Sequence, residues 1–381
     1  MPVERALPTE EARDLLALAH ELAVKELAPR AAEYEARSEF PADVVHTIAR
    51  AGMLGLPYPE ELGGGGQPYG VYLQVLEELA AGWAAVALTV SVHTLACFPL
   101  ATFGAPALRD QMLPGMLAGD RLGAYCLSEA HAGSDAAALA TRAVREDDTY
   151  LVNGTKAWVT CAGRADLYNV FVRTGDAGPR GISLLLADAD TPGLQVQRPE
   201  RKMGLRSSPT AAVSFEEARV PARRLVGAEG EGFRAAMAAL DGGRLGVAAM
   251  ATGVAQAALD HAIGYTRQRR QFGRPVIEFQ GLGFLLADMA TGVEAARALY
   301  LEAARRRDAG QPYSRLASMA KLFATDTAMR VTTDAVQALG GAGYVEDHPV
   351  ERFMREVKVM QIFEGTNQIQ RVVISRSLAA E

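Results

Sequence analysis

Apolar residues in the first 120 positions recur at the spacing of helices rather than of strands. A first helix is predicted after Pro8-Thr9-Glu10-Glu11, where a threonine N-cap precedes acidic first-turn residues. Pro41 opens a second, short helix that ends near Gly52. Further helices are expected at about 69–81, 84–98 and 105–118.

The stretch from Ala84 to Phe98 is apolar enough to be tested as a membrane span. It is shorter than the roughly 20 residues that a span needs, and it contains Ser91 and His93 before it meets Pro99. We therefore expect a buried helix and no membrane span.

The pattern changes near Asp120 to short β-like runs separated by Gly and Pro, as in a barrel or a sandwich. Asn153-Gly154 lies between Tyr150-Leu-Val and Lys156–Thr160 and is the strongest hairpin signal in the chain. Other β-like runs lie at 168–172, 182–186 and 212–215.

From about residue 229 the helical period returns in long segments. These segments are predicted at 229–267, 275–308, 313–339, 348–362 and 366–378. The predicted fold is mainly α with a central β domain. It has an N-terminal helical domain (1–120), a middle β-barrel domain (121–225) and a C-terminal four-helix bundle (226–381).

Composition excludes several classes of protein. The chain has 381 residues and a net charge of −6, which gives no electrostatic reason to expect nucleic acid as a partner. Three cysteines form no CxxC pair, and six scattered histidines form no HExxH motif, so we expect neither disulfides nor a metal site. A reducing, cytoplasmic setting and a chain without a signal peptide fit best.

Three windows carry candidate chemistry, and the first is Tyr125–Asp135. Ser128, Ser134 and Asp135 stand there among small residues that permit close backbone approach, so their hydroxyl and N–H groups can hold a polar ring edge or a phosphate. From composition alone a solvated turn is the stronger interpretation.

The second window is Met360–Gln368, in which Glu364 follows Ile362 and Phe363 at the end of a predicted helical run closed by Gly365. A helix C-terminus and apolar neighbours both disfavour the ionised carboxylate, so both would raise its pKa. A general base that works near neutral pH needs such a pKa. An exposed glutamate beside a C-cap glycine is an equally good interpretation.

The third window is Arg269–Gly273, followed by Phe279-Gln280. Two arginines could bind a pyrophosphate, although a charged helix end is the stronger interpretation of an isolated pair. No GxGxxG follows a predicted strand and no GxxxxGK[ST] loop is present, so a nucleotide cofactor would be held by other means.

Together these windows resemble the acyl-CoA dehydrogenase family of flavoproteins. Five motifs in the family's order carry the resemblance over nearly the whole chain: AYCLSEAHAGSD (124–135), KAWVT (156–160), RRQFG (269–273), QALGGAGY (337–344) and IFEGTNQIQR (362–371).

The resemblance implies a bound FAD and the α,β-dehydrogenation of an acyl-CoA thioester, with Glu364 as the catalytic base and flavin N5 as the hydride acceptor. It also implies a homotetramer and an electron-transfer flavoprotein as electron acceptor. By motif position, the residues that contact the cofactor within one subunit are Tyr125, Leu127, Ser128, Ser134, Trp158, Thr160, Thr366 and Gln368. Those that reach the FAD of a neighbouring subunit are Arg269, Phe272, Gln280, Gln337, Gly340 and Gly341. The residues implied near the substrate are Ser134, Asp241, Arg244 and Gly365.

Some members of the family place the base on the first long bundle helix. Here that stretch reads Leu240-Asp241-Gly242-Gly243-Arg244, and the glycine at position 243 leaves Glu364 without a rival. Asp241 and Arg244 either contact substrate or form a buried ion pair with each other.

The resemblance also bears on the substrate. Members that act on dicarboxylic acyl groups carry an arginine in the segment resembling Ser91–Pro99, and this chain has no Lys or Arg there. An acyl wall made of Val90, Val92, Leu95 and Phe98 favours an uncharged chain of short to medium length, as in the butyryl-CoA type. The usual Glu-Pro after the serine is Glu129-Ala130 here.

Three alternatives remain. An acyl-CoA oxidase would use oxygen, but the extra C-terminal domain usual in that group is not expected here. Flavin monooxygenases and nitroalkane oxidases on this fold generally lack the glutamate. A non-catalytic CoA-ester-binding protein would have no need of Glu364, Arg269 and Gln337 together.

Overall fold

The computed structural model describes residues 5–380 and begins with a helical region. Thr9 is the N-cap of the first helix, as predicted, and its hydroxyl accepts a hydrogen bond from the N–H of Ala12 at 3.1 Å. A π-helical turn at Ala23–Leu27 joins the first two helices. The helices of this region are α1 (Glu10–Leu22), α2 (Ala28–Arg37), α3 (Ala42–Arg50), α4 (Tyr69–Gly82), α5 (Ala84–Phe103) and α6 (Pro106–Leu117).

Helix α5 continues through Pro99 to Phe103, so the prediction that it ends at Pro99 is wrong. A proline inside a helix removes one backbone hydrogen bond. Packing compensates, because α5 is buried along almost its whole length against α4, α7 (Gly232–Gln268) and β1 (Gly123–Cys126). Within residues 5–380, α5 is the one helix long and apolar enough to cross a membrane, and its residues are buried inside the protein.

The middle region is a curved seven-stranded sheet in the order β1-β4-β2-β3-β7-β6, with β5 pairing to β4. Its first strand runs parallel to β4, and the long strands β3 and β7 pair antiparallel. After β1 the strands are β2 (Arg142–Glu146), β3 (Thr149–Thr160), β4 (Leu167–Arg173), β5 (Ile182–Asp188), β6 (Leu194–Val196) and β7 (Thr210–Pro221).

The hairpin predicted at Asn153-Gly154 is wrong, because β3 runs through this dipeptide without turning. The chain turns instead at Asp147-Asp148, between the paired residues Glu146 and Thr149. Asn153-Gly154 forms a bulge in β3, where the Asn153 side chain accepts a hydrogen bond from the N–H of Glu217 at 2.9 Å. The dipeptide's conformational freedom is thus used to bend a strand rather than to reverse it.

The C-terminal region is helical again, which confirms the predicted order of helical, β and helical parts. A small hairpin of β8 (Arg270–Gln271) and β9 (Arg274–Pro275) separates the first two long helices. The helices after α7 are α8 (Gln280–Asp308), α9 (Ser314–Leu339), α10 (Val350–Lys358) and α11 (Asn367–Ala379). The boundaries of the three units, near 120 and 225, stay predictions.

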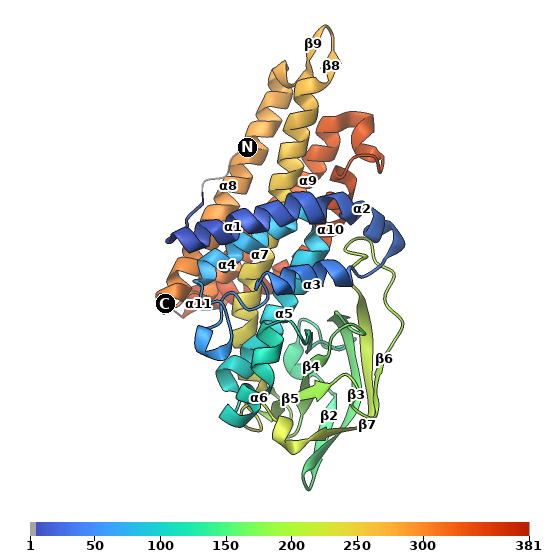
Figure 1. Cartoon of the computed structure of the whole chain (residues 1–381), viewed down its shortest axis with the longest axis vertical. Coiled ribbons are helices and arrows are strands. Elements are labelled where there is room, and N and C mark those ends of the chain that lie inside the picture. The colour runs from blue at the N-terminus through green and yellow to red at the C-terminus, as the bar shows by residue number, and fades with distance from the viewer. Residues whose placement is uncertain (1–4, 381) are drawn as a thin grey trace.

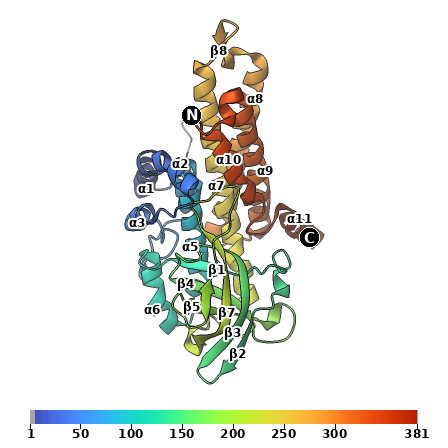
Figure 2. The same ribbon diagram turned by 90° about the vertical axis from the view of Figure 1, so that its right-hand side faces the viewer.

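Figure 1 shows the bundle in the upper part of the molecule and the sheet in the lower part, with α5 reaching from one to the other. The β8–β9 hairpin lies at the end of the bundle away from the sheet (Figure 1). In the view turned by 90°, the C-terminal helix α11 projects from the side of the bundle near the sheet (Figure 2). The junction between bundle and sheet is therefore where segments from all three regions meet.

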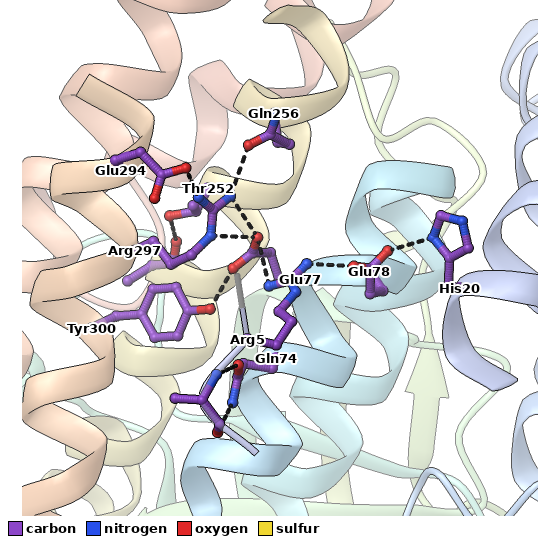
Figure 3. Close-up of polar contacts among 12 residues, drawn as sticks. Arg5, His20, Gln74, Glu77, Glu78, Thr252, Gln256, Glu294, Arg297 and Tyr300 are labelled. Carbon is purple, nitrogen blue, oxygen red and sulfur yellow. Dashed lines mark hydrogen bonds and ion pairs between the residues drawn. The ribbon is translucent and has the colours of Figure 1, made fainter. Parts of the chain in front are cut away.

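A buried polar cluster around Glu77 joins the N-terminal region to the bundle (Figure 3). The Glu77 carboxylate, 1% exposed, accepts hydrogen bonds from the Arg297 guanidinium at 2.9 and 3.1 Å and from the Tyr300 hydroxyl. Arg5 adds an ion pair to the same carboxylate at 2.9 Å. Helices α4 and α8 and the N-terminal segment are thus held together by one buried carboxylate.

Candidate active site

Glu364 lies in a tight loop between two helices. The chain leaves α10 at Lys358 and passes through a 3₁₀ turn at Val359–Gln361 before it reaches this loop. Glu364 (φ 52°) and Gly365 (φ 86°) both adopt left-handed backbone conformations, and Thr366 then caps α11. The predicted helical run up to Gly365 is therefore wrong in detail: the glutamate stands in a sharp bend.

The Glu364 carboxylate is buried, and neither oxygen has a hydrogen-bond partner within residues 5–380. Burial raises the pKa of Glu364 to about 7, against the opposing effect of the charges on Lys321 and Arg244. The sequence predicted this direction from the apolar neighbours. A buried carboxyl group whose pKa lies near neutrality suits a general base.

The glycine at position 243 makes room for this carboxylate. A Cβ atom built on Gly243 would lie 2.0 Å from Oε2 of Glu364, which no real structure tolerates. Any larger residue at this position of α7 would displace the Glu364 side chain. A carboxylate could therefore occupy this space from either of two positions, residue 243 on α7 or residue 364 in the loop. In this protein Glu364 in the loop occupies it.

Lys321 on α9 holds the Glu364 loop in place, and sequence reasoning missed it. Its buried ammonium group donates to the carbonyl of Gly365 and to the side chain of Asn367, both at 2.9 Å. Gln370 adds a second donor to the Gly365 carbonyl, at 2.8 Å. Burial lowers the pKa of Lys321 to about 7. The sequence did contain one signal for a buried lysine: Lys321 stands on a helix face that otherwise carries alanines.

Asp241 and Arg244 form an ion pair beside Glu364. The hydroxyl of Ser314 donates to the same Asp241 oxygen at 2.9 Å. The Arg244 charge is among those that oppose the rise in the pKa of Glu364, while its buried Nε atom has no partner within the described chain. The pair predicted from the sequence is thus formed, and it lies close enough to influence the carboxylate.

A small cavity of about 10 Å³, room for one water molecule, lies next to this carboxylate. Helix α5 presents Ser91, Thr94, Leu95 and Phe98 to the cavity, whereas Val90 and Val92 pack in the main core. Of the four residues predicted for this wall, Leu95 and Phe98 therefore line the cavity, whereas Val90 and Val92 do not, because helical spacing places them on another side of α5.

The cavity also meets other helices. Tyr58 and Tyr69 line it, as do Gly242 and Gly243 of α7. Helix α8 contributes Arg307 to the wall of this cavity, and the preference for an uncharged acyl chain stays a prediction. The sequence segment that was considered has no cation, but the fold supplies one from a distant part of the chain.

The first candidate window reaches the same junction through β1. The Tyr125 hydroxyl donates to the carbonyl of Ala236 on α7 at 3.2 Å. Burial of this hydroxyl and, less strongly, the Glu364 charge raise the pKa of Tyr125. Leu127 is buried, Ser128 is half-buried and Ser134 is exposed. Small residues and free hydroxyls thus lie on the sheet side of the junction.

Lys156 and Glu129 fix this window to β3. The buried Lys156 ammonium donates to the Leu127 carbonyl at 3.1 Å and to the Glu129 carboxylate at 2.8 Å. Glu129 also accepts from the N–H groups of Ala140 and Thr141. These partners outweigh burial and lower the pKa of Glu129 to about 2. The loop is therefore held firmly although alanine stands at position 130 in place of the usual proline.

Trp158 and Thr160 lie near the end of β3. Trp158 has a left-handed backbone (φ 61°) at a register shift of the strand, and its side chain is 62% exposed. Such strain at an exposed aromatic residue is typical of a binding site. The exposed indole of Trp158, several hydroxyl groups and small residues thus lie on one side of the junction. A surface of this kind fits a large aromatic cofactor with polar ring edges.

The remaining predicted residues do not join Glu364 within one chain. Arg269 and Phe272 lie at the β8–β9 hairpin and are exposed, Phe272 to 93%. Gln280, Gln337, Gly340 and Gly341 are exposed as well. Of the α11 residues, Thr366 accepts a hydrogen bond from the N–H of Ile369 at 3.2 Å, and Gln368 is exposed. In residues 5–380, no three His, Cys, Asp or Glu side chains lie close enough together to hold a metal ion.

A buried carboxylate without a hydrogen-bond partner in residues 5–380, with a pKa raised by burial, is a candidate functional group. Three family descriptions match the chain in order. They are acyl-CoA dehydrogenase N-terminal domain (residues 9–120), middle domain (124–218) and C-terminal domain (230–379). The chain belongs to the acyl-CoA dehydrogenase family.

Individual relatives agree over nearly the full length. An acyl-CoA dehydrogenase of Bacillus subtilis is 44% identical over 97% of this chain and 98% of its own. The butyryl-CoA dehydrogenase structure from Megasphaera elsdenii matches with a TM-score of 0.96 at 41% identity and covers both chains completely. A chain in a structure reported for the electron-transferring flavoprotein of Acidaminococcus fermentans matches with a TM-score of 0.97 at 42% identity, again over both whole chains.

Proposed function

We propose that this protein catalyses the FAD-dependent α,β-dehydrogenation of an acyl-CoA thioester, with Glu364 as the catalytic base. The observation that carries the proposal is the buried Glu364 carboxylate, which has no hydrogen-bond partner in residues 5–380 and lies against Gly243, one of the residues that line a small cavity. A carboxylate held in this way has its lone pairs free for a substrate proton.

The reaction removes a proton from the α-carbon and a hydride from the β-carbon, and a carbon–carbon double bond forms between them. Glu364 takes the proton. The N–H of Glu364 has no acceptor within the described chain, so it can donate to the thioester oxygen as negative charge develops there. FAD, when bound, supplies the hydride acceptor at N5. Lys321 and Gln370 hold the Gly365 carbonyl and thereby orient this N–H and the carboxylate together.

The residues proposed to hold FAD within one subunit are those of the sheet side of the junction and of the start of α11. The flavin would meet Tyr125, Leu127, Ser128, Ser134, Trp158 and Thr160, and the adenosine diphosphate would meet Thr366 and Gln368. Asp241, Arg244, Ser134 and Gly365 would face the substrate. The free hydroxyls and the exposed Trp158 support this assignment.

We propose a short acyl group, a cytoplasmic location and an electron-transfer flavoprotein as electron acceptor. A relative from Megasphaera elsdenii, 42% identical, is named as short-chain specific.

Anaerobic mixing with butyryl-CoA should bleach the yellow purified protein, because the flavin is reduced as the acyl group is oxidised. Admitting air should restore the colour only slowly. Absorbance near the flavin maximum follows both steps. A protein that never bleaches with any acyl-CoA would contradict the proposed function, and rapid reoxidation by air would identify an oxidase instead.

The protein should purify as a homotetramer in which Arg269 contacts the FAD of a neighbouring subunit. The exposed positions of Arg269 and Phe272 in the isolated chain support such an interface. Arg269→Ala removes a charge-assisted donor and should release FAD at a lower urea concentration than wild type does, with Arg305→Ala as the control on an exposed face. Light scattering gives the assembly state. A monomer that retains FAD at micromolar concentration would contradict this prediction.

A further inference from the structure

Lys321 on α9 carries a buried charge whose hydrogen-bond partners are all neutral. Its side chain is 0% exposed, and its ammonium group donates to the carbonyl of Gly365 and to the side chain of Asn367. Lys321 forms no ion pair within residues 5–380. A buried cation is costly without a counter-charge, so the charge of Lys321 depends on the nearest carboxylate that has no partner of its own.

Asp326 is one carboxylate near Lys321, and its charge is already engaged. One of its oxygens accepts hydrogen bonds from the side-chain amides of Asn367 and Gln361, at 2.7 and 2.6 Å. Its other oxygen forms an ion pair with Arg371 at 3.4 Å. The Asn367 side chain lies between Lys321 and Asp326, because it accepts from the first and donates to the second. Asp326 therefore leaves most of the Lys321 charge uncompensated.

The other charged and titratable groups near the Glu364 carboxylate are compensated or neutral. Arg244 on α7 forms an ion pair with Asp241, so its charge is already balanced. The tyrosines that interact with the same carboxylate stay neutral near pH 7, because burial raises the pKa of each of them. They are Tyr69, Tyr72 and Tyr125.

Lys321 and Glu364 are the two opposite charges that remain, and they meet at the same bend of the chain. The Lys321 ammonium group bonds the carbonyl of Gly365, the residue that follows Glu364, while neither Glu364 oxygen has a hydrogen-bond partner within the described chain. Burial raises the pKa of Glu364, and the charge that opposes this most strongly is that of Lys321. Burial likewise lowers the pKa of Lys321, and the charge that opposes this most strongly is that of Glu364. Each group is thus the main counter-charge of the other.

We propose that Lys321 is a positioning residue for proton abstraction, which holds the bend at Gly365 and supplies the charge that keeps the Glu364 carboxylate ionised. This inference rests on the proposed function and adds an effect of charge to the contact that orients the loop. A protonated Glu364 cannot accept the α-proton of a substrate. Without a nearby cation, a buried carboxyl group holds its proton at neutral pH, so the charge of Lys321 increases the fraction of enzyme that is ready to react.

The test is the pH profile of single-turnover flavin reduction by butyryl-CoA. Lys321→Met removes the charge at similar length, so the pH at which the rate reaches half its maximum should rise by about one pH unit. At pH 7 the rate should fall by about fivefold from this change alone, and it should recover as the pH is raised above 8. A loosened loop would lower the rate at every pH and would leave the midpoint of the profile where it is.

Gln370→Met is the matched control. The Gln370 amide donates to the same Gly365 carbonyl at 2.8 Å but carries no charge. This variant should lower the rate at every pH and leave the midpoint unchanged. Lys321→Gln, which keeps a neutral donor, gives the same comparison if Lys321→Met does not fold. A midpoint that stays at the wild-type value without the Lys321 charge, or that moves equally in Gln370→Met, would overturn the proposal.

Infrared titration of the holoenzyme without substrate separates this proposal from the proposed function. The carbonyl band of a protonated carboxyl group that disappears in Glu364→Gln belongs to Glu364. The pH midpoint of this band should rise in Lys321→Met by the same amount as the midpoint of the rate, and an unmoved band would overturn the proposal. If no acyl-CoA reduces the flavin, the proposed function fails, and this titration still decides the role of Lys321.

Discussion

Glu364→Gln should keep the fold, the flavin and acyl-CoA binding, and should lose flavin reduction by about 10²–10⁴-fold. The amide has nearly the shape of the carboxylate but cannot accept the α-proton. Stopped-flow absorbance in a single turnover with saturating butyryl-CoA measures the loss. A variant that still reduces its flavin within about tenfold of the wild-type rate, roughly 1.4 kcal/mol of barrier, would show that another group is the base.

The pH dependence of the same reaction provides a second check. Because burial raises the pKa of Glu364 to about 7, the wild-type rate should rise between pH 6 and pH 8 as the carboxylate ionises. The native pKa lies above the ordinary glutamate pKa of 4.5, so this group makes the fold less stable as pH rises from about 4.5 to about 7. At pH 8, Glu364→Gln should therefore unfold at a temperature no lower than wild type does. A large fall in that temperature would mean that lost activity reflects a damaged fold.

Glu77→Gln should lower the free energy of unfolding by about 3–5 kcal/mol, the usual cost of removing one partner of a buried ion pair. The variant leaves the buried Arg297 and the Arg5 guanidinium without their shared carboxylate (Figure 3). At one fixed protein concentration, differential scanning calorimetry should show a thermal midpoint several degrees lower.

Glu302→Gln is the matched control. Glu302 lies on the same helix as Arg297 and pairs with Arg305 and Arg306 on the exposed surface. Surface ion pairs contribute little, so this variant should melt close to wild type. If Glu77→Gln also melts within one degree of wild type, the cluster does not hold the N-terminal region to the bundle.

The order of helical and β regions was predictable because apolar residues repeat at different spacings in helices and strands, and long segments make that difference clear. The prediction of a hairpin at Asn153-Gly154 was wrong for a physical reason. A turn and a bulge need the same backbone freedom, and only the pairing of β3 with β7 decides between them. Helix α5 likewise passes Pro99 because burial against three neighbours outweighs one lost hydrogen bond.

At the site, the sequence located the base but not its surroundings. Glu364 was found from its apolar neighbours and from the resemblance, and its raised pKa follows from burial. Lys321 and Arg307 were missed because each lies more than 40 positions before Glu364 in the sequence. Which charged side chain of a helix turns inward depends on tertiary packing, and no local pattern records it.

Helix α7 spans 37 residues without a break, from Gly232 to Gln268. It carries Arg244 beside the base, and Arg269 directly follows its last residue, so the rigid helix holds these two arginines about 36 Å apart. In the proposed tetramer the length of α7 therefore sets the distance between the active centre of one subunit and the cofactor of the neighbouring subunit. Inserting a single residue would turn Arg269 by about 100° around the axis. We therefore expect the length of this helix to be constrained more tightly than the identity of its residues.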